Sequence, residues 1–226
     1  MTAATFFRRV LRLFSWALAL FLVLSVGSVL AFRWIDPPTS AFMLREPNAV
    51  RYRWVDWANT SPHVKVAVIA AEDQNFPAHY GFDLKSINDA LADRERGRRV
   101  RGASTISQQV AKNLFLWPGQ TWARKGLEAY FTLLIETLWP KQRILEVYLN
   151  IAEFGRGVYG VGAASDVYFH KPAARLSPYD GALLAAVLPS PKRMRVNAPS
   201  NYVRSRQQWI LGQMRGLGGT NLLKEL

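Results

Sequence analysis

The chain from residue 61 to residue 83 reads SPHVKVAVIAAEDQNFPAHYGFD, and it predicts a helix with acids at its far end. Ser61 and Pro62 match a helix N-cap and a first-turn proline, and Val64 begins an apolar spacing typical of a helix. Glu72 is therefore expected near the helix C-terminus, where the helix dipole disfavours negative charge by about 0.3 to 1 kcal/mol. We expect a raised pKa for Glu72, which suits a general base; a helix end with solvated acids is the alternative.

Length and composition limit the possible classes of protein. The chain has 226 residues, half of them apolar, which is enough for one domain with a good core besides the N-terminus. It contains no cysteine, so disulfides, a thiolate nucleophile and a cysteine-based metal site are excluded. Its formal net charge of +13 favours an anionic partner, for which phosphate groups, membrane lipid and nucleic acid all qualify.

The N-terminus predicts a membrane anchor. Three arginines lie within residues 1–12, and the run from Leu13 to Phe32 is uncharged and about as long as the twenty residues that span a bilayer. We predict a cytoplasmic segment 1–12 and a transmembrane helix 13–34, with the rest of the chain outside the cytoplasm. A signal peptide cleaved after the small residues Val29 and Ala31 is the alternative, but the apolar run is longer than in typical signal peptides.

Residues 35–60 and 61–226 differ in character. The segment 35–60 has little periodicity and mixes aromatic residues with arginines, so we predict a membrane-proximal linker and arm. The segment 61–226 is predicted to be one mainly α domain, with helices at about 122–139, 141–151, 161–169, 178–188 and 201–214. Gly216 is expected to cap the last helix, and no strand pair is expected outside the arm.

Two segments between these helices need separate interpretation. A short helix is expected over 84–91, followed by the charged run DRERGRRVRG at 93–102, which predicts a solvated loop and a candidate lid over an anionic substrate. The run GRGVYG at 155–160 has the letters of a dinucleotide-binding motif but follows a helix. Its glycines instead predict a tight turn against neighbouring backbone.

The segment 102–113 reads GASTISQQVAKN and predicts a second polar helix start. Thr105 and Gln108 have capping-box spacing, so a helix is expected to begin at Ser104 or Thr105. Together with Gln109 and Lys112, these side chains and the helix N-terminal amides are suited to hold phosphate or sugar oxygens. A capped, half-exposed helix without a ligand is the alternative.

The segment 124–128 reads RKGLE, and its charges lie at the start of a long predicted helix. Arg124 and Glu128 are one turn apart, so an intrahelical ion pair worth about 0.2 to 0.5 kcal/mol is the simplest interpretation. Against this, Arg124 and Lys125 are poorly placed for the helix dipole, which favours a role in binding an anion.

Taken together, five segments in this order closely resemble the peptidoglycan glycosyltransferases of glycosyltransferase family 51: EDQNFPAHYGFD, GASTISQQVAKN, RKGLE, KQRILEVYLN and GVYGVGAASDVYFHK. The resemblance covers roughly residues 45 to 200, and the short length is similar to that of the monofunctional biosynthetic members. Ser107 departs from the usual threonine but keeps the hydroxyl. The chain shows no SxxK and KTG elements, so no transpeptidase activity is expected.

The resemblance implies a mainly α, lysozyme-like lobe with a small membrane-associated jaw, here at about 84–104. It implies polymerisation of lipid II by inverting transfer, with release of undecaprenyl diphosphate, at the bacterial inner membrane. Glu72 matches the family's catalytic base and Glu128 its second essential acid. The resemblance also implies further substrate-binding residues, with the cations placed at the diphosphate: Asp73, Ser104, Thr105, Gln108, Gln109, Lys112, Arg124 and Lys125.

Partners and cofactors follow from the same resemblance. Lipid II, the growing glycan chain and inner-membrane lipid are the expected partners, with other cell-wall synthesis proteins as further candidates and no nucleic acid. No cofactor is expected to be required and no protein metal site is predicted, because the three histidines make no metal-ligand spacing. A divalent cation, Mg²⁺ or Mn²⁺, at the diphosphate stays open.

Three other classes of protein share some of these features. A lysozyme-like peptidoglycan hydrolase uses a similar pair of carboxylates, but it acts on finished glycan and needs no lipid diphosphate. A non-catalytic scaffold for cell-wall synthesis is harder to reconcile with two acids beside a group of cations. Nucleic-acid binding rests on net charge alone, and the predicted topology keeps the basic domain away from DNA.

Overall fold

The chain forms two compact units, Met1–Asp36 and Pro37–Leu226. A computed structural model describes residues 3–85, 88, 92, 96, 104–119 and 121–226. The short helix predicted over 84–91, the lid predicted at 93–102 and the jaw at 84–104 fall largely on residues outside this part of the chain.

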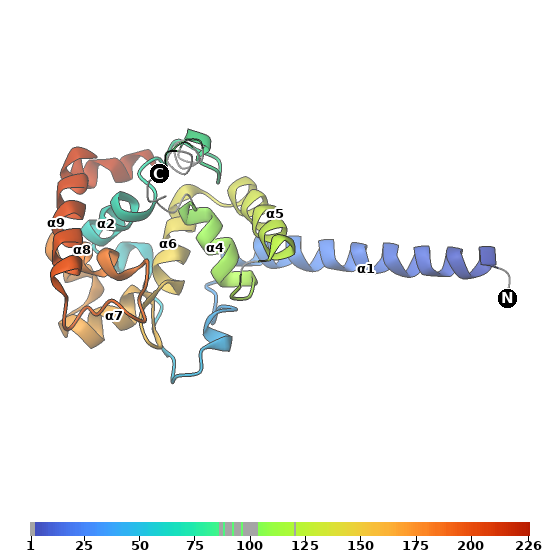
Figure 1. Cartoon of the computed structure of the whole chain (residues 1–226), viewed down its shortest axis with the longest axis horizontal. Coiled ribbons are helices and arrows are strands. Elements are labelled where there is room, and N and C mark those ends of the chain that lie inside the picture. Colours follow the sequence, from blue (N-terminus) through green and yellow to red (C-terminus); the bar gives the residue numbers. More distant parts are fainter. Residues whose placement is uncertain (1–2, 86–87, 89–91, 93–95, 97–103, 120) are drawn as a thin grey trace. The chain divides into compact units, whose positions relative to one another are not determined.

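The first unit consists mainly of the helix α1 (Ala3–Phe32) (Figure 1). Within it, the 27 residues Phe6–Phe32 are long and apolar enough to cross a membrane, and no second candidate span is found in the described residues. At a rise of about 1.5 Å per residue this stretch exceeds the roughly 30 Å of a hydrocarbon core. The helix begins N-terminal to the predicted span 13–34 and includes the three arginines of residues 1–12.

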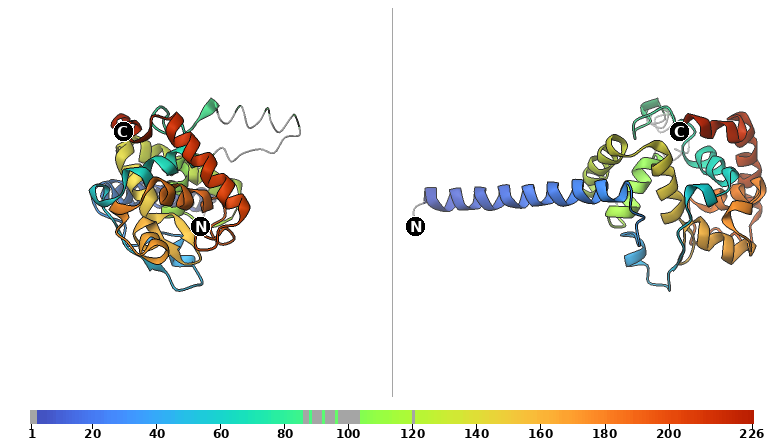
Figure 2. Two further views of the ribbon diagram at one scale, coloured as in Figure 1. Left: turned by 90° about the vertical axis from the view of Figure 1, so that its left-hand side faces the viewer. Right: turned by 180° about the vertical axis from the view of Figure 1, so that it is seen from behind.

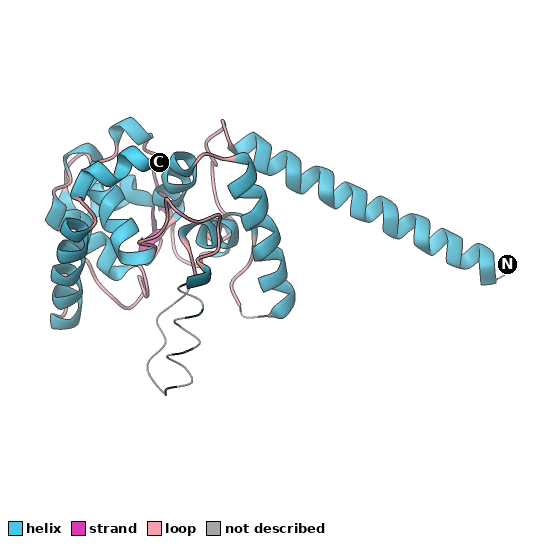
Figure 3. Ribbon diagram, turned by 90° about the horizontal axis from the view of Figure 1, so that it is seen from above, coloured by secondary structure: helices cyan, strands magenta, loops and turns pink. Residues whose placement is uncertain are grey.

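The second unit is built almost entirely of helices (Figure 3). Helix makes up 64% of the structure and strand 3%, which confirms the predicted mainly α class. The described α-helices of this unit are α2 (Pro62–Glu72), α4 (Ile106–Phe115), α5 (Trp122–Leu138), α6 (Lys141–Ile151), α7 (Gly160–Phe169), α8 (Pro178–Val187) and α9 (Asn201–Gly216). Short 3-10 helices are η1 (Met43–Arg45), η2 (Trp57–Asn59), η3 (Ala173–Arg175) and η4 (Gly219–Glu225).

Local capping sets most of the helix starts, as the sequence predicts. The Ser61 side chain accepts a hydrogen bond from the backbone of His63, with Pro62 as the first helical residue. Thr105 and Gln108 form a complete capping box at the start of α4. The predicted cap at Gly216 is wrong: α9 includes Gly216, and Gly218 adopts the left-handed conformation instead, at φ 82°.

The helices of the second unit pack in two groups. Helix α2 packs against α8 and α9, and α4 packs against α5 and α6. Figures 1 and 2 show α2, α8 and α9 toward one end of this unit, with α4 and α5 toward the other. Helix α2 is buried without interruption from Val64 to Ala70, and α8 approaches it closely because Gly181 has no side chain: a Cβ there would lie 3.0 Å from the Val64 Cα.

A small sheet corrects the expectation that no strand pair lies outside the arm. It contains β1 (Arg51–Tyr52), β2 (Glu153–Gly155) and β3 (Val158–Tyr159) in the order β1-β3-β2, with β1 parallel and β2 antiparallel to β3. Strands of two or three residues are too short for an alternating pattern to appear in the sequence. The predicted tight turn is confirmed, because Gly157 has φ 70° and a Cβ there would lie 2.5 Å from the Ala49 carbonyl oxygen.

The arm that follows Pro37 is fixed to the second unit at several points. The backbone amides of Ala41 and Phe42 donate to the carbonyls of Leu114 and Asn113, at 3.1 and 3.2 Å, near the C-terminus of α4. The arm then reaches the sheet through strand β1. The second unit therefore starts at Pro37 and includes most of the segment 35–60 that the sequence assigned to a linker.

Candidate functional site

Two adjacent acids end helix α2, and they have different surroundings. Asp73 is the C-cap of α2 and is 7% exposed. Its carboxylate contacts the His79 Nε2 at 2.9 and 3.1 Å and accepts a hydrogen bond from the backbone amide of Ile106 at 2.9 Å. Because Ile106 is the first residue of α4, Asp73 joins the end of one helix to the start of the next.

Glu72 is the last residue of α2, and its carboxylate has fewer partners. Its Oε2 accepts a hydrogen bond from the Gln109 Nε2 at 2.9 Å, and its Oε1 lies 3.6 Å from the guanidinium of Arg206 on α9. Burial raises the pKa of Glu72 above its ordinary value, against the opposing effects of Gln109, Arg206 and Lys112. The predicted direction is confirmed, with burial as its main cause.

A buried tyrosine orients the Gln109 side chain. The Tyr148 hydroxyl, on α6, donates to the Gln109 Oε1 at 3.1 Å, so the amide nitrogen of Gln109 is turned toward Glu72. Burial raises the pKa of Tyr148 well above its ordinary value, which keeps the hydroxyl protonated and able to donate. Three helices thus determine how the Glu72 carboxylate lies.

A cavity of about 120 Å³ adjoins Gln109 on the side of α4 and α5. It is lined by Ser104, Gln108, Gln109, Lys112, Arg124, Lys125 and Glu128. The structure thus brings together most of the predicted site residues, and Glu72 meets this group through its hydrogen bond to Gln109. Thr105 lies outside the lining, because its hydroxyl donates to the Gly81 carbonyl at 2.7 Å and caps α4. Asp73 is likewise occupied within the fold.

Three cations and one carboxylate face this cavity. Glu128 accepts a hydrogen bond from the Arg124 guanidinium at 2.6 Å and also contacts the Lys125 ammonium, and its side chain is only 3% exposed. The ion pair expected between Arg124 and Glu128 is therefore present. Burial lowers the pKa of Lys112, while the charge of Glu128 favours its ammonium form. With one carboxylate among three cations, two positive charges remain in excess for an anion.

A second hollow, of about 330 Å³, shares two of these cations with the first. It is lined by Thr121, Trp122, Arg124 and Lys125. The Nε of Arg124 is buried and has no hydrogen-bond partner among the described residues. Arg124 and Lys125 therefore line both hollows, and Arg124 keeps a free donor among the described residues.

The donor set does not fit a protein metal site. The described residues contain no group of three or more histidine, cysteine or acidic side chains that could hold a metal ion. Of the acids near the cavity, Glu128 is engaged by Arg124 and Lys125. No step of the chemistry is therefore derived through a metal bound by this chain alone.

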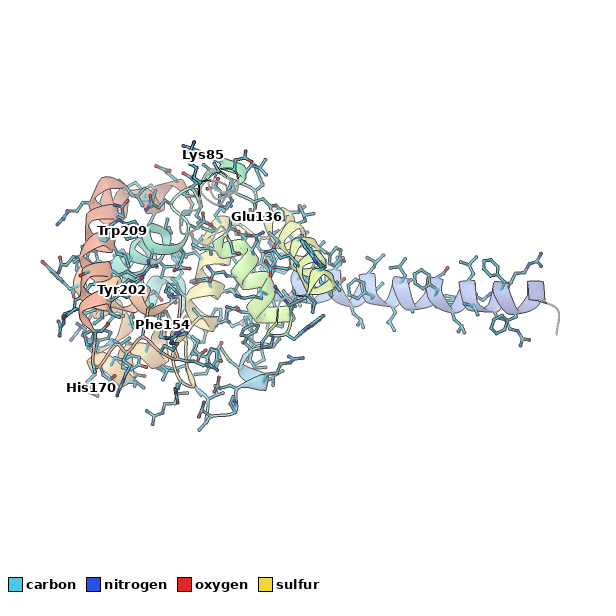
Figure 4. The ribbon with its side chains drawn as sticks, in the orientation of Figure 1. Lys85, Glu136, Phe154, His170, Tyr202 and Trp209 are labelled. Atoms are coloured by element: carbon cyan, nitrogen blue, oxygen red, sulfur yellow. The ribbon has the colours of Figure 1, made fainter. Side chains whose placement is uncertain are left out.

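Ser107, the departure from the usual family pattern, also has a defined place. Its hydroxyl contacts the carboxylate of Glu136 on α5, which is labelled in Figure 4. Glu136 in turn accepts from the Lys141 ammonium at 2.9 Å, and Lys141 also donates to the His79 carbonyl at 2.5 Å. The serine hydroxyl thus joins α4 to α5 and to the segment that follows Glu72.

Sequence reasoning missed three residues of the site: Tyr148, Arg206 and His79. Tyr148 and Arg206 lie in helices that the sequence predicts at 141–151 and 201–214, and neither position carries a local signal of function. His79 was set aside because it has no metal-ligand spacing. Each meets the site through a contact with a side chain far away in the sequence or across a turn, for which no local pattern exists.

Comparison with known proteins agrees with this arrangement. The family model described as Transglycosylase matches residues 40–215. Biosynthetic peptidoglycan transglycosylases of Salmonella paratyphi B, Salmonella typhi and Salmonella enteritidis are each 55% identical to this chain over 230 residues. The alignments cover 97% of this chain and 94% of each relative. The chain belongs to the transglycosylase family.

Proposed function

We propose that this chain is a peptidoglycan glycosyltransferase that polymerises lipid II, a disaccharide-pentapeptide on undecaprenyl diphosphate, into linear glycan strands. Its family and its relatives support this activity over a hydrolase or a non-catalytic scaffold. One observation carries the assignment of residues: Gln109 contacts the buried Glu72 carboxylate and also lines the cavity that holds three cations. A proton acceptor and a site for an anionic leaving group therefore adjoin each other.

In this mechanism Glu72 is the general base. The 4-hydroxyl of the acceptor sugar attacks the anomeric carbon of the growing chain and transfers its proton to the ionised Glu72 carboxylate. A new carbon–oxygen bond forms as the bond to the diphosphate oxygen breaks, and the α linkage becomes β. The raised pKa of Glu72 suits it to accept a proton near neutral pH. Oε1 is the oxygen assigned to this role, because Oε2 is engaged by Gln109.

The departing diphosphate carries the electron pair and needs its charge neutralised. Lys112, Arg124 and Lys125 are assigned to it, since oriented cations in a partly dry cavity stabilise developing charge strongly. Glu128 fixes the positions of Arg124 and Lys125. Ser104, Gln108 and Gln109 are assigned to sugar or phosphate oxygens, while Asp73 and Thr105 act by holding α4 in place.

The helix α1 and the family membership indicate a membrane-anchored enzyme. We assign it more finely to the bacterial inner membrane, with the N-terminus in the cytoplasm and the catalytic unit outside it, because the arginines precede the apolar run. This places the catalytic unit beside its lipid-linked substrate. Recruitment by other cell-wall synthesis proteins stays a prediction.

The test of the assignment is Glu72→Gln in the full-length protein. Glycan formation from labelled lipid II should fall by a factor of about 100 to 10,000, because proton transfer loses its acceptor. Binding of lipid II should remain, because the cations are unchanged. Normal glycan synthesis by this variant would eliminate Glu72 as the base. Activity of the unaltered protein on finished, lipid-free glycan would instead indicate a hydrolase.

A further inference from the structure

Lys112 differs from the other two cations of the cavity in how it is held. Arg124 and Lys125 both contact the Glu128 carboxylate. Within the described part of the chain, the Lys112 ammonium makes no hydrogen bond or ion pair, and its Nζ lies 5.7 Å from the centre of the Phe42 ring. This distance falls within the roughly 6 Å over which an aromatic face attracts a cation. Among the described residues, the ring is therefore the direct contact of this ammonium, while Glu128 and Glu72 act on it through their charge.

The arm places the Phe42 ring there by backbone contacts. The amides of Ala41 and Phe42 donate to carbonyls of Leu114 and Asn113 in the last turn of α4. Carbonyls at a helix C-terminus have no partner within the helix, so these bonds are a regular way to satisfy them. Lys112 lies in the same last turn of α4, three residues before its final residue, Phe115. The position of residue 42 relative to Lys112 is thus set independently of the Phe42 side chain.

We propose that Phe42, a residue of the arm, is a positioning residue of the active site: its ring holds the Lys112 ammonium at the cavity wall and leaves the N–H donors free for the diphosphate. A carboxylate partner would engage some of those donors and offset part of the positive charge, as Glu128 does for Arg124 and Lys125. An aromatic face attracts the cation without accepting in the direction of the cavity. The inference rests on the proposed function, in which Lys112 binds the diphosphate.

The family match supports including the arm in the catalytic unit. The matched region begins at residue 40, two residues before Phe42 and well before the first residue of α2. The compact second unit likewise begins at Pro37. The arm is therefore positioned to contribute a side chain to the site as well as to connect it to α1.

The experiment compares Phe42→Leu with Phe42→Tyr and Phe42→Trp in the full-length protein on lipid II. The leucine variant should raise KM by roughly three- to tenfold and lower kcat as well, because Lys112 both binds the diphosphate and neutralises the charge that develops on it. Loss of the ring also favours the neutral amine of Lys112, so the alkaline limb of kcat/KM should move to lower pH. Tyrosine and tryptophan keep an aromatic face and should restore all three values.

Two further variants separate this inference from the proposed function. Leu44→Ala removes an exposed side chain of the same arm, 73% accessible, and should leave KM unchanged. Lys112→Met should itself weaken lipid II use, and adding Phe42→Leu to it should have no further effect. If Lys112→Met raises KM but Phe42→Leu does not, the role of Phe42 is overturned and the proposed function stands. If Lys112→Met leaves KM unchanged, Lys112 does not bind the diphosphate, and the role of Phe42 is overturned with that assignment.

Equal impairment by leucine, tyrosine and tryptophan would also overturn the inference, because it would show that side-chain shape and not an aromatic face is required. An additional loss from Phe42→Leu in the Lys112→Met background would do the same. Thermal unfolding of each variant checks that the arm still packs. The backbone bonds to α4 are expected to hold it in place whatever the side chain.

Discussion

Glu72 and Glu128 are two largely buried glutamates of the candidate site, and their neighbours suit them to opposite proposed roles. The Glu128 side chain is 3% exposed and contacts two cations directly. The Glu72 side chain is 13% exposed, accepts one amide hydrogen bond and has its cation 3.6 Å away. The Glu128 carboxylate is engaged by two cations, whereas burial raises the pKa of Glu72 and makes it the better proton acceptor near neutral pH. The same residue type therefore organises cations in one place and is suited to take a proton in the other.

The largest effect on stability expected from this comparison is that of Glu128→Gln. The substitution removes the charge that pairs with Arg124, whose side chain is only 8% exposed, and leaves a buried guanidinium unbalanced. We expect a fall of about 3 kcal/mol in the free energy of unfolding together with a loss of activity of about 100-fold. Chemical denaturation and glycan synthesis from lipid II measure the two effects.

The matched control is Glu72→Gln, which should abolish activity without loss of stability. Because burial disfavours the ionised form of Glu72, a neutral amide of similar shape should leave the melting temperature equal or higher. If Glu72→Gln were the more destabilising of the two, the contrast between the acids would be broken.

A smaller effect is expected from Gln109→Leu, which removes the amide donor from Glu72. The hydrogen bond favours the ionised carboxylate, so its loss should raise the pKa of Glu72 further. A general base works only when ionised, and the acid limb of the activity profile should therefore move to higher pH. On the acid side of the profile, the variant should be roughly five- to tenfold less active than the unaltered protein at the same pH. At higher pH, where Glu72 is ionised in both proteins, the activity of the variant should recover.

Gln74→Leu is the corresponding control. Gln74 lies two residues after Glu72 and donates to Gln213 and to the Ala70 carbonyl, away from the cation cavity. The pH profile of the Gln74→Leu variant should match that of the unaltered protein. An acid limb that stays in place in Gln109→Leu would contradict the role given to this hydrogen bond.

The smallest effect concerns a third glutamate, Glu153 on β2, which tests whether a raised pKa alone identifies a base. Burial raises the pKa of Glu153 to about 7, and the Lys192 ammonium, 3.8 Å away, opposes this shift. The folded protein then keeps a proton between about pH 4.5 and 7 that the unfolded chain releases. Stability should therefore fall as pH rises through this range, by on the order of 1 kcal/mol.

Glu153→Gln should flatten that pH dependence and leave glycan synthesis intact. Unfolding by urea at several pH values between 4.5 and 7 measures the slope, and the product assay measures activity. A variant that lost activity with unchanged stability would mean that Glu153 belongs to the reaction. The proposal that Glu72 takes part in the reaction and Glu153 does not would then be contradicted.

Local sequence signals predicted the helices that hold the site. The Ser61–Pro62 cap, the capping box of Thr105 and Gln108, and the break between the helices predicted at 122–139 and 141–151 are each contained within a few residues. The structure confirms all three. The raised pKa of Glu72 was also predicted in direction. These features follow from hydrogen bonds within one turn of helix, so neighbouring residues are sufficient to determine them.

The remaining features depend on contacts across the chain. The sheet pairs Arg51 with Val158, more than a hundred residues apart, and its strands are too short to leave a pattern. The approach of Arg206 to Glu72 requires α9 to pack beside α2, which no local signal specifies. The expected cap at Gly216 failed for a related reason, because several glycines near the end of α9 are locally equivalent and the left-handed position falls to Gly218.

The cap at Ser61 also determines which of two neighbouring acids lies beside Gln109, and so which one the proposed mechanism uses as its base. Successive residues of an α-helix are rotated by about 100°, so the direction in which position 72 points is counted from the first turn of α2. Deleting one residue between the cap and the acids would make the Asp73 side chain point in the direction that Glu72 now has. The backbone amide of Ile106, the first residue of α4, would then lose the Asp73 carboxylate that accepts its hydrogen bond. The number of residues in α2 therefore determines the direction of the Glu72 side chain. We expect natural relatives to differ more in the residue types of this helix than in its length.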